Sequence, residues 1–317
     1  MSNYKINDLV ATREAFGDAL VEVGKKLSSL LVLDGETSNS TYTDKFQKLF
    51  PERFLEMFIA EQNIASVGLG LSKMGFIPVM ATFAAFWTRA FDQIRMAQYS
   101  KPDLKFVGSH AGVAIGADGP SQMGLEDIAM FRSILNSVVL YPSDAVSAAK
   151  LTRIMVKEPG LFYLRVTRNK TPVIYKNQEE FKIGSSKIHK SKILNHKSKV
   201  LIMAAGITVH EALKAQKQLA EENIETVVMD CYSVKPLDVT TIKYLIKTIK
   251  NVVVVEDHYP AGGLGEAILS SIIHDLSLIN FIHLYVRKIP RSGTPEELLA
   301  YEEIDATAIV TTVKTLL

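Results

Sequence analysis

Short β-rich runs alternate with segments of helical periodicity along this chain of 317 residues. The alternation is typical of parallel sheets covered by helices on both faces, because each parallel crossover needs a helix-length connection. It falls into two series. In the first series, strands are predicted over residues 29–35, 53–60, 76–82, 103–110, 137–142 and 161–166, with helices over 14–27 and 63–73. In the second, strands are predicted over residues 199–206, 225–231, 251–257 and 281–289, with helices over 209–223, 240–250 and after Gly262.

A stretch rich in Lys, Ser and Asn at residues 174–198 separates the two series and is typical of a surface connection. We therefore predict an α/β protein of two three-layer α/β/α domains with mostly parallel sheets. The first domain is expected over residues 1–180 and the second over 198–317, with a linker or crossover at 181–197.

The composition is that of an ordinary globular chain, with 47% hydrophobic and 22% charged residues. Its net charge of +2 is spread out, and without a Lys/Arg block we expect no nucleic-acid partner. No apolar run reaches the roughly 18–20 residues that span a bilayer, and the first residues do not resemble a secretory signal. We expect a cytoplasmic protein without membrane contact, in which the single cysteine, Cys231, is buried packing.

The run FIAEQNIASVGLGLS at residues 58–72 places one carboxyl group, Glu61, at an apolar strand-to-helix junction. Withdrawing a carboxylate from water without a nearby cation raises its pKa, and the neutral acid can then donate a proton or a hydrogen bond at pH 7. The competing interpretation is an ordinary Glu in the first turn of a helix, where the helix dipole favours it. Alone, the run favours this second interpretation, and the downstream sequence changes the balance.

The segment TFAAFWTRAFDQIRMAQYS at residues 82–100 predicts a helix after a strand. Within it Phe86, Ala90, Ile94 and Ala97 keep helical spacing, which favours burial in the core. Phe83 lies just before this helix at a strand end, where α/β folds place ligands, and its ring could stack on an aromatic ligand. Simple packing of Phe83 is the ordinary alternative.

The densest polar motif is GSHAGVAIGADGPSQMGLED at residues 108–127, whose glycines suit a loop with its backbone close to a ligand. In this motif His110 and Asp118 could orient substrate hydroxyls or move protons, and Gln122 could hydrogen-bond a sugar oxygen. A turn held by Asp and Gly explains the motif about as well. No metal site is expected in this chain, because the other His residues are scattered and no CxxC or HxxxH spacing exists.

Two arginines are candidate anion binders. Arg13 follows the capping residue Thr12 at a helix start, and Arg168 follows a strand end in LRVTR. Ser40 in ETSNST could add a hydroxyl donor, although each of these residues is, taken singly, more often a solvated surface residue. The Gly-rich run VEDHYPAGGLGEA at residues 255–267 lacks GxGxxG spacing and predicts a tight strand-to-helix turn.

Six motifs, in order, resemble the C-terminal half of transketolase, particularly of the animal-like type. They are FIAEQNIASVGLG, TFAAFWTRAFDQIRMA, GSHAGVAIGADGPSQMGLEDIAMFRS, YPSDA, VVEDHYPAGGLGEA and VRKIPRSGTPEELL, and they cover nearly the whole chain. The resemblance implies a thiamine diphosphate enzyme that transfers a two-carbon ketol unit from a ketose phosphate to an aldose phosphate. It also implies a pyrimidine-binding first domain followed by the transketolase C-terminal domain.

The resemblance assigns the cofactor contacts by motif. Glu61 is similar to the family's catalytic glutamate, which hydrogen-bonds N1′ of the aminopyrimidine and favours the imino tautomer whose 4′ nitrogen deprotonates thiazolium C2. This implies a neutral Glu61. Phe83, Phe86 and Arg89 match the pocket around the pyrimidine.

The same resemblance assigns the substrate contacts. His110, also expected to be catalytic, Asp118 and Gln122 match residues that contact the C1 and C2 oxygens and the donor ketose, and Gln122 stands where many bacterial and yeast-like members have His. The residues that match those gripping the terminal phosphate of the sugar are Arg13, Ser40 and Arg168.

The chain contains no GDG motif, which in the family begins the diphosphate- and metal-binding loop of an N-terminal domain. We therefore expect the C-terminal subunit of a split transketolase that is active only with a separate N-terminal subunit. That partner is expected to supply the ligands of Mg²⁺ or Ca²⁺, in an α2β2 assembly with the cofactor across the interface.

Three alternatives stay open. The β subunit of a 2-oxoacid dehydrogenase has the same domain plan, but a small 2-oxo acid offers no distal dianion for Arg13, Ser40 and Arg168. Deoxyxylulose-phosphate synthase shares the AEQ and ADG elements, but TRAFDQIRMA and GPSQMGLEDIAMFRS fit transketolase better. A non-catalytic scaffold subunit is disfavoured by the intact Glu61 and His110. Ribose 5-phosphate and xylulose 5-phosphate are the expected substrates, with a sulfonated or unusual phosphorylated ketose possible. The second domain is expected to serve assembly, without a catalytic constellation after Lys199.

Overall fold

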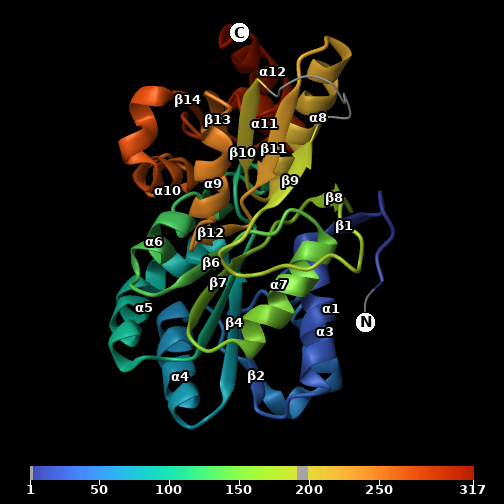
Figure 1. Ribbon diagram of the computed structural model, residues 1–317. Helices are drawn as coiled ribbons and strands as arrows, with labels where there is room; N and C mark the ends of the chain where they lie inside the picture. Colours follow the sequence, from blue (N-terminus) through green and yellow to red (C-terminus); the bar gives the residue numbers. More distant parts are fainter. Residues whose placement is uncertain (1–2, 191–198) are drawn as a thin grey trace.

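The computed structural model of the chain describes residues 3–190 and 199–317. Over these residues it forms two sheets enclosed by helices, and a short antiparallel ribbon of β1 (Leu9–Ala11) and β8 (Lys170–Pro172) (Figure 1). Most strand pairs in the two sheets are parallel. The predicted class, two three-layer α/β/α domains with mostly parallel sheets, is confirmed.

The first sheet has the strand order β12-β6-β7-β5-β4-β2-β3. All its neighbours pair in parallel except at one edge, where β12 runs antiparallel to β6. The strands are β2 (Leu30–Asp34), β3 (Phe54–Glu56), β4 (Ile77–Phe83), β5 (Leu104–Ser109), β6 (Val138–Leu140), β7 (Leu161–Arg165) and β12 (Ser233–Lys235).

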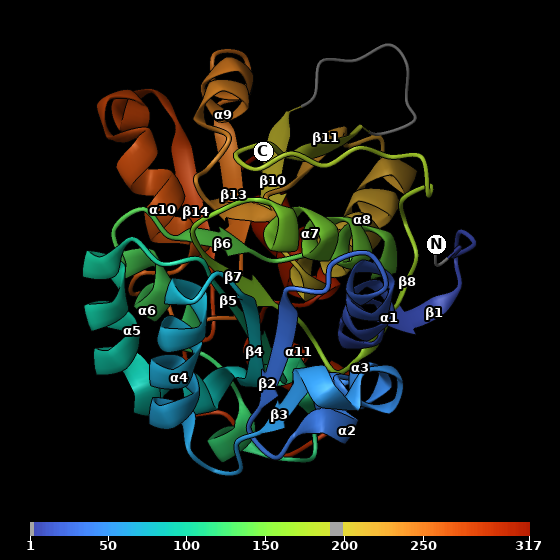
Figure 2. The ribbon, with the colours of Figure 1, turned by 90° about the horizontal axis from the view of Figure 1, so that it is seen from below.

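Helices cover both faces of this sheet because successive strand residues point to opposite sides. In β2, Leu31 and Leu33 join the cluster that contains the buried residues of α4, α5 and α6, whereas Leu30 and Val32 join the cluster of α1 and α7. Figure 2 shows these two sets of helices on either side of the strands. The helices are α1 (Thr12–Gly24), α4 (Glu61–Lys73), α5 (Phe91–Ala97), α6 (Asp127–Ser133) and α7 (Ala145–Lys157).

Short helical segments fill the connections of the first domain. They are α2 (Ser38–Thr41), α3 (Asp44–Leu49), and the 3₁₀ turns η1 (Pro51–Arg53), η2 (Ala84–Ala90), η3 (Gln98–Ser100), η4 (Val113–Ile115) and η5 (Pro120–Gln122). Four of them, α2, η2, η4 and η5, follow the carboxyl ends of β2, β4 and β5, which is the edge where parallel sheets place ligands.

The second sheet has the order β14-β13-β10-β11-β9, with β9 antiparallel to β11 and the other pairs parallel. Buried residues of α8 and α12 pack on one face, and those of α9 and α10 on the other. The strands are β9 (Lys187–Lys190), β10 (Val200–Ala204), β11 (Thr226–Asp230), β13 (Asn251–Val255) and β14 (Asn280–Leu284). The helices are α8 (Ile207–Glu221), α9 (Val239–Ile246), α10 (Leu264–Ser271), η6 (Ile273–Leu278), α11 (Pro295–Tyr301) and α12 (Ala306–Thr315).

The two domains share part of their structure. β12 belongs by sequence to the second series but completes the first sheet, and β9 lies inside the expected linker at 181–197 but pairs with β11 in the second sheet. Within the expected linker or crossover, residues 187–190 thus form a strand of the second sheet, and residues 191–197 lie outside the described range. Strand exchange of this kind is invisible to local sequence patterns, because partner choice depends on how the domains dock.

Other predicted elements differ in detail. The strand expected over residues 53–60 is confined to β3, and the one expected over 281–289 ends at Leu284. The predicted turn at 255–267 is confirmed, since β13 ends at Val255 and α10 begins at Leu264. Cys231 is buried and free, and burial raises the pKa of its thiol. Among the helices of the described residues, none has the length and apolar character needed to cross a bilayer.

Candidate functional site

The predicted site residues come from separate segments but gather at the carboxyl edge of the first sheet. Phe83 is the last residue of β4, and His110 directly follows β5. Arg168 follows the end of β7, and Glu61 is the first residue of α4, shortly after β3. Because parallel strands all end at one edge, residues far apart in the sequence are brought to one face of the domain.

Glu61 is buried, with 3% of its side chain exposed, and its Oε1 lies 2.5 Å from Nη1 of Arg89. The guanidinium of Arg89, which is 47% exposed on the other side, also lies over the Phe86 ring at 4.4 Å. The sequence argument for a protonated Glu61 assumes a carboxyl group without a nearby cation, whereas the structure places the Arg89 guanidinium in contact with it.

Phe83 and Phe86 stack with ring centroids 5.1 Å apart, and Phe83 stacks on His110 at 3.8 Å. Phe86 is only partly buried, which corrects the expectation that it belongs to the core with Ala90, Ile94 and Ala97. The reason is local. Residues 84–90 form a 3₁₀ helix with three residues per turn, so Phe86 leaves the apolar stripe that α5 continues.

His110 is held in an unusual backbone conformation, with φ of 57°, and is 2% exposed. Its Nδ1 lies 3.0 Å from the Ser109 hydroxyl. Burial lowers the pKa of His110 to about 3, and the positive charges of Arg13 and Arg168 contribute in the same direction. The imidazole is therefore neutral at pH 7, and it can donate or accept a hydrogen bond but carries no charge.

Arg13 donates from Nη1 to the main-chain oxygen of Ser40 at 2.7 Å, and its Nε is buried without a hydrogen-bond partner. The contact uses the main-chain carbonyl of Ser40, so it leaves the Ser40 hydroxyl, the predicted donor to a bound anion, outside this bond. Burial lowers the pKa of Arg13, with Arg168 adding to this effect and Tyr42 opposing it. A buried, unused donor on a cation is the feature of an anion site.

The position of Ser40 is set by a buried carboxylate at the end of β2. Asp34 accepts hydrogen bonds from the hydroxyls of Thr37, Thr41 and Thr43 at 2.8 to 3.0 Å. Burial raises the pKa of Asp34, and these hydroxyl bonds oppose the rise. The ETSNST segment is thereby anchored on both sides of Ser40.

Arg168 forms an ion pair with Asp118, 2.5 Å from Nη1 to Oδ2, so two predicted substrate residues contact each other. Both side chains are partly exposed, at 39% and 33%. Gln122 lies farther along the loop, on η5, which packs against η2, the segment of Phe86 and Arg89. The loop thus reaches from Arg168 to the segment of Phe86 and Arg89.

A buried ionic network behind the site was missed from the sequence. Arg165, the last residue of β7, contacts Asp127 at 2.8 Å and Asp257 of the second domain at 2.9 Å, and all three are buried. Tyr163 donates to Asp127 at 2.6 Å, and Tyr141 donates to Asp257 at 3.0 Å. The available signal was a charged residue inside the apolar strand LFYLRV, since a buried Arg needs partners.

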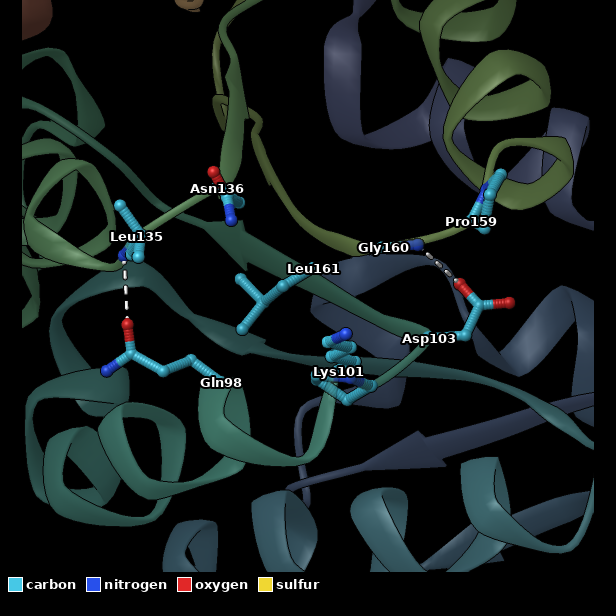
Figure 3. A pocket seen from close by; sticks show the side chains of 9 residues that line it. Gln98, Lys101, Asp103, Leu135, Asn136, Pro159, Gly160 and Leu161 are labelled. Atoms are coloured by element: carbon cyan, nitrogen blue, oxygen red, sulfur yellow. Dashed lines mark hydrogen bonds between the residues drawn. The ribbon is translucent and has the colours of Figure 1, made fainter.

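A cavity of about 330 Å³ lies at the opposite edge of the same strands (Figure 3). Its lining includes Gln98, Lys101, Asp103, Asn136 and Leu161, and none of these is a predicted site residue. Among the described residues, no group of three or more His, Cys, Asp or Glu side chains is placed to hold a metal ion.

Family models match both domains. Residues 8–173 match the transketolase pyrimidine binding domain, and residues 189–309 match the transketolase C-terminal domain. The chain belongs to the transketolase family. Transketolase-like protein 2 of Mus musculus is 47% identical over 313 residues, covering 98% of this chain and 49% of that protein. Transketolase of Homo sapiens is 43% identical over 320 residues, covering 100% of this chain and 51% of that protein.

The chain thus spans about half the length of the curated transketolases it matches. A solved structure described as a split gene transketolase, in an inactive beta4 tetramer, superposes with a TM-score of 0.87 at 35% identity. That match covers 97% of this chain and 98% of the other. The transketolase of Campylobacter jejuni shares the fold, with a TM-score of 0.83 at 18% identity over 48% of that chain.

Proposed function

We propose that this chain is one half of a two-subunit transketolase, which transfers a two-carbon ketol unit between sugar phosphates. The observation that carries the proposal is one continuous array at the carboxyl edge of the first sheet. It begins with buried Glu61, continues through the stacked Phe86, Phe83 and His110, and ends at the pair Arg13 and Arg168. An aromatic cofactor ring at one end and a phosphate at the other suit these groups.

The residues fit the pyrimidine half of thiamine diphosphate. Phe86 offers a partly exposed ring and Glu61 a buried carboxyl group at a helix start, which are the two kinds of contact an aminopyrimidine uses. When bound, the cofactor supplies a carbon nucleophile that attacks the ketose carbonyl. Glu61 would hold the pyrimidine ring nitrogen through a hydrogen bond, and Arg89 would release the carboxyl group for that purpose.

The positive charges at the other end of the array suit the phosphate of a sugar substrate. Arg13 and Arg168 place two guanidinium groups near one buried neutral imidazole, and Arg13 Nε has no partner within the chain. A sugar phosphate can accept from both cations, while His110 and Asp118 hydrogen-bond its hydroxyls. Arg168 would exchange part of its pairing with Asp118 for the phosphate. A 2-oxo acid without a distal dianion would leave these cations unused, which disfavours the dehydrogenase alternative.

The diphosphate and its metal ion are assigned to a partner. No described group of this chain is suited to a metal ion, and the match of nearly equal length to a split gene transketolase subunit supports a two-chain enzyme. We propose an α2β2 assembly in which a separate N-terminal subunit binds the diphosphate with Mg²⁺ or Ca²⁺. Two sites would then lie at interfaces between unlike subunits.

The test is co-expression of this chain with the N-terminal transketolase-like subunit of the same genome. Ketol transfer is measured with thiamine diphosphate, Mg²⁺, xylulose 5-phosphate and ribose 5-phosphate. We expect activity in the mixture only. Full activity of this chain alone would contradict the two-subunit proposal. An assembled, cofactor-binding but inactive mixture would contradict these two substrates, and a sulfonated ketose would be the next donor tested.

A further inference from the structure

The loop of residues 111–124 carries two of the predicted substrate residues, Asp118 and Gln122, and closes on itself at a narrow neck. At this neck the amide of Gly112 donates to the Gly124 carbonyl at 2.8 Å, and the amide of Gly124 donates to the His110 carbonyl at 3.3 Å. His110 is therefore tied to the neck through its own main chain. A shift of the neck would move the imidazole and change how the whole loop is presented.

The neck is attached to a buried guanidinium. Arg165 Nη2 donates to the Gly124 carbonyl at 2.8 Å and to the main-chain oxygen of Asp257 at 3.2 Å. Its Nη1 donates to the Asp257 carboxylate at 2.9 Å, and its Nε donates to Asp127 at 2.8 Å. One side chain thus joins the neck to a residue of the second domain.

Asp257 also touches the neck directly. Gly112 has φ of 78°, and a Cβ added to it would lie 1.8 Å from Oδ2 of Asp257. The carboxylate therefore rests against the main chain of the loop, and no side chain separates them. Its other bonds come from the Tyr141 hydroxyl, at 3.0 and 3.1 Å, which fix its orientation.

A second contact from the same domain supports the tip of the loop. A Cβ added to Gly119 would lie 2.8 Å from the Ser292 hydroxyl, and one added to Gly116 would lie 3.2 Å from the Gly293 carbonyl. The adjoining helix α11 packs against η4 within the loop. Asp118 lies between these two glycines, so its backbone is supported on both sides.

We propose that the C-terminal domain positions the substrate loop, with Asp257 and Arg165 holding its neck and Ser292–Gly293 supporting its tip. These are positioning residues, since they act through His110 and Asp118 rather than by touching substrate. The proposal rests on the proposed ketol-transfer function for its consequence in catalysis. It gives the second domain a role in the reaction, where the sequence suggested assembly alone.

The alternative is an ion network that only joins the two domains. Apolar residues often replace a buried ion pair without loss of stability, so joining the domains does not by itself require Arg165 and Asp257. Holding a main-chain carbonyl does require a donor, and Arg165 supplies one to Gly124. A joining role predicts a loss of stability alone, whereas a positioning role predicts a loss of substrate recognition in the assembled enzyme.

The first test compares wild type and Asp257→Asn in the co-expressed complex. Asn keeps the shape of Asp but removes the charge that orients Arg165. We expect kcat/KM for the sugar phosphates to fall about tenfold to a hundredfold, as small misplacements of binding groups do. KM should account for most of the change, with the same amount of assembled complex. Unchanged kcat/KM with a lowered melting temperature would overturn the proposal.

The second test needs no activity. Hydrogen–deuterium exchange of residues 111–124 is measured in the purified full chain, and we expect faster exchange in Asp257→Asn than in wild type. If the wild-type complex transfers no ketol unit, the proposed function fails. Faster exchange of residues 111–124 in Asp257→Asn would still establish that Asp257 holds the neck of the loop. Equal exchange in the two proteins would exclude it whatever the activity.

The third test avoids the buried network in case Asp257→Asn fails to fold. Ser292 is exposed, so Ser292→Leu should fold while pressing a larger side chain against Gly119. We expect KM to rise and hydrogen–deuterium exchange of the loop to increase in Ser292→Leu. Thr311→Leu, an equivalent change at an exposed position of α12, is the matched control and should alter neither. No difference between Ser292→Leu and this control would contradict the role of the tip contact.

Discussion

The amino and carboxyl edges of the first sheet both carry polar and charged side chains, but these side chains are paired differently. The amino edge has a cavity of about 330 Å³, charged residues, and two non-glycine residues with positive φ, Lys101 and Asn136. Its polar groups bond one another: the Asp103 carboxylate accepts from the Gly160 amide at 3.2 Å, and the side-chain Oε1 of Gln98 accepts from the Leu135 amide at 3.0 Å (Figure 3). The carboxyl edge instead holds a buried carboxyl group, a buried neutral imidazole and a cation with an unused donor.

The difference shows that a cavity with polar lining is not enough to define a site. At the amino edge the polar atoms complete the turns that lead into β5, β6 and β7. Even the buried ammonium of Lys105 is satisfied there, by the Glu158 and Gly160 carbonyls and by Asp103, so these groups serve the fold. At the carboxyl edge groups are buried at an energetic cost that the fold alone does not require. Substitutions at the two edges should therefore have opposite consequences for activity and stability.

The largest effect is expected from Glu61→Gln. Gln has the same shape but cannot give up or accept a proton as a carboxyl group does, and general acid–base groups contribute about 10²–10⁴-fold to rate. Turnover of the co-expressed complex should fall by a factor in this range while the subunits still assemble, as measured by size-exclusion chromatography. A scaffold subunit would lose nothing.

Asp103→Asn is the matched control at the amino edge. It makes the same chemical change to a carboxylate that accepts from the Gly160 amide and pairs with the buried Lys105 at 2.6 Å, so a loss of stability is expected. Turnover at a temperature where the complex is folded should stay within about twofold of wild type, because surface and turn changes act mainly through stability. An equal loss of turnover in both variants would erase the distinction between the two edges.

Arg168→Ala should give the next largest effect, on recognition of the phosphate. Charge-assisted hydrogen bonds contribute about 1.5–3 kcal/mol, so KM for a sugar phosphate should rise about tenfold to a hundredfold. KM for the corresponding unphosphorylated sugar should change little. The control is Arg153→Ala, which removes an arginine of α7 that pairs with Glu22 of α1. Equal changes for both sugars would show that Arg168 does not bind the phosphate.

The sequence predicted which residues lie at the carboxyl edge of the first sheet, because their positions depend on local strand and helix patterns. Phe83, His110 and Arg168 each follow a β-rich run, and parallel strands must end at the same edge. Glu61 at a helix start and the turn after Val255 follow from the same kind of pattern. The ends of most strands and the turn after Val255 were therefore predictable without knowledge of the tertiary structure, whereas the buried helical face assigned to Phe86 was not.

Contacts across long sequence separations were not predictable. Arg89 and Glu61 are 28 residues apart, and Arg165 and Asp257 are 92 apart in different domains. Each pairing depends on how whole helices and strands dock, and the residue types in the sequence do not predict this docking. For the same reason the sequence did not reveal the strand β9 within the expected linker or crossover, or the position of Asp257 beside the loop.

Asp230 sharpens the comparison, because it is buried and polar but belongs to neither edge. Burial raises its pKa to about 7, and bonds from the hydroxyls of Ser143 and Tyr175, both at 2.7 Å, oppose the rise. A carboxyl group whose folded pKa lies above its unfolded value binds more protons in the folded state. Its contribution to stability therefore falls as pH rises from about 4 to about 7 and then stays constant.

Asp230→Asn removes this titration. The melting temperature of the variant relative to wild type should increase between pH 5 and pH 8, by an amount corresponding to a few kcal/mol. The difference between the two proteins is the quantity to measure, since buried His residues with lowered pKa values, such as His210, oppose the trend below pH 6.5. Turnover should be unaffected. A difference that does not vary with pH would show that Asp230 is ionised throughout.

Arg89→Ala should have a smaller effect, on cofactor affinity. Arg89 holds Glu61 at 2.5 Å, and a pyrimidine that takes this carboxyl group must break the pair. The pair is half exposed on the Arg side, where ion pairs contribute about 0.2–1 kcal/mol, so the Kd for thiamine diphosphate should fall about twofold to fivefold. Arg95→Ala, at an exposed pair with Asp92, is the control. A higher Kd in Arg89→Ala would show instead that Arg89 binds the cofactor.

The smallest effect is expected from Gln98→Ala, which opens the amino-edge cavity. Its amide bridges the Leu135 amide and the Arg95 carbonyl, and its loss leaves a turn less well bonded. We expect a loss of about 1 kcal/mol of stability, the usual net value of one hydrogen bond, with kcat and KM unchanged. Urea unfolding and the ketol-transfer assay measure these separately. Changed kinetics at unchanged stability would mean that this cavity communicates with the opposite edge through β5 and β7, and the two edges would then have to be treated as one functional unit.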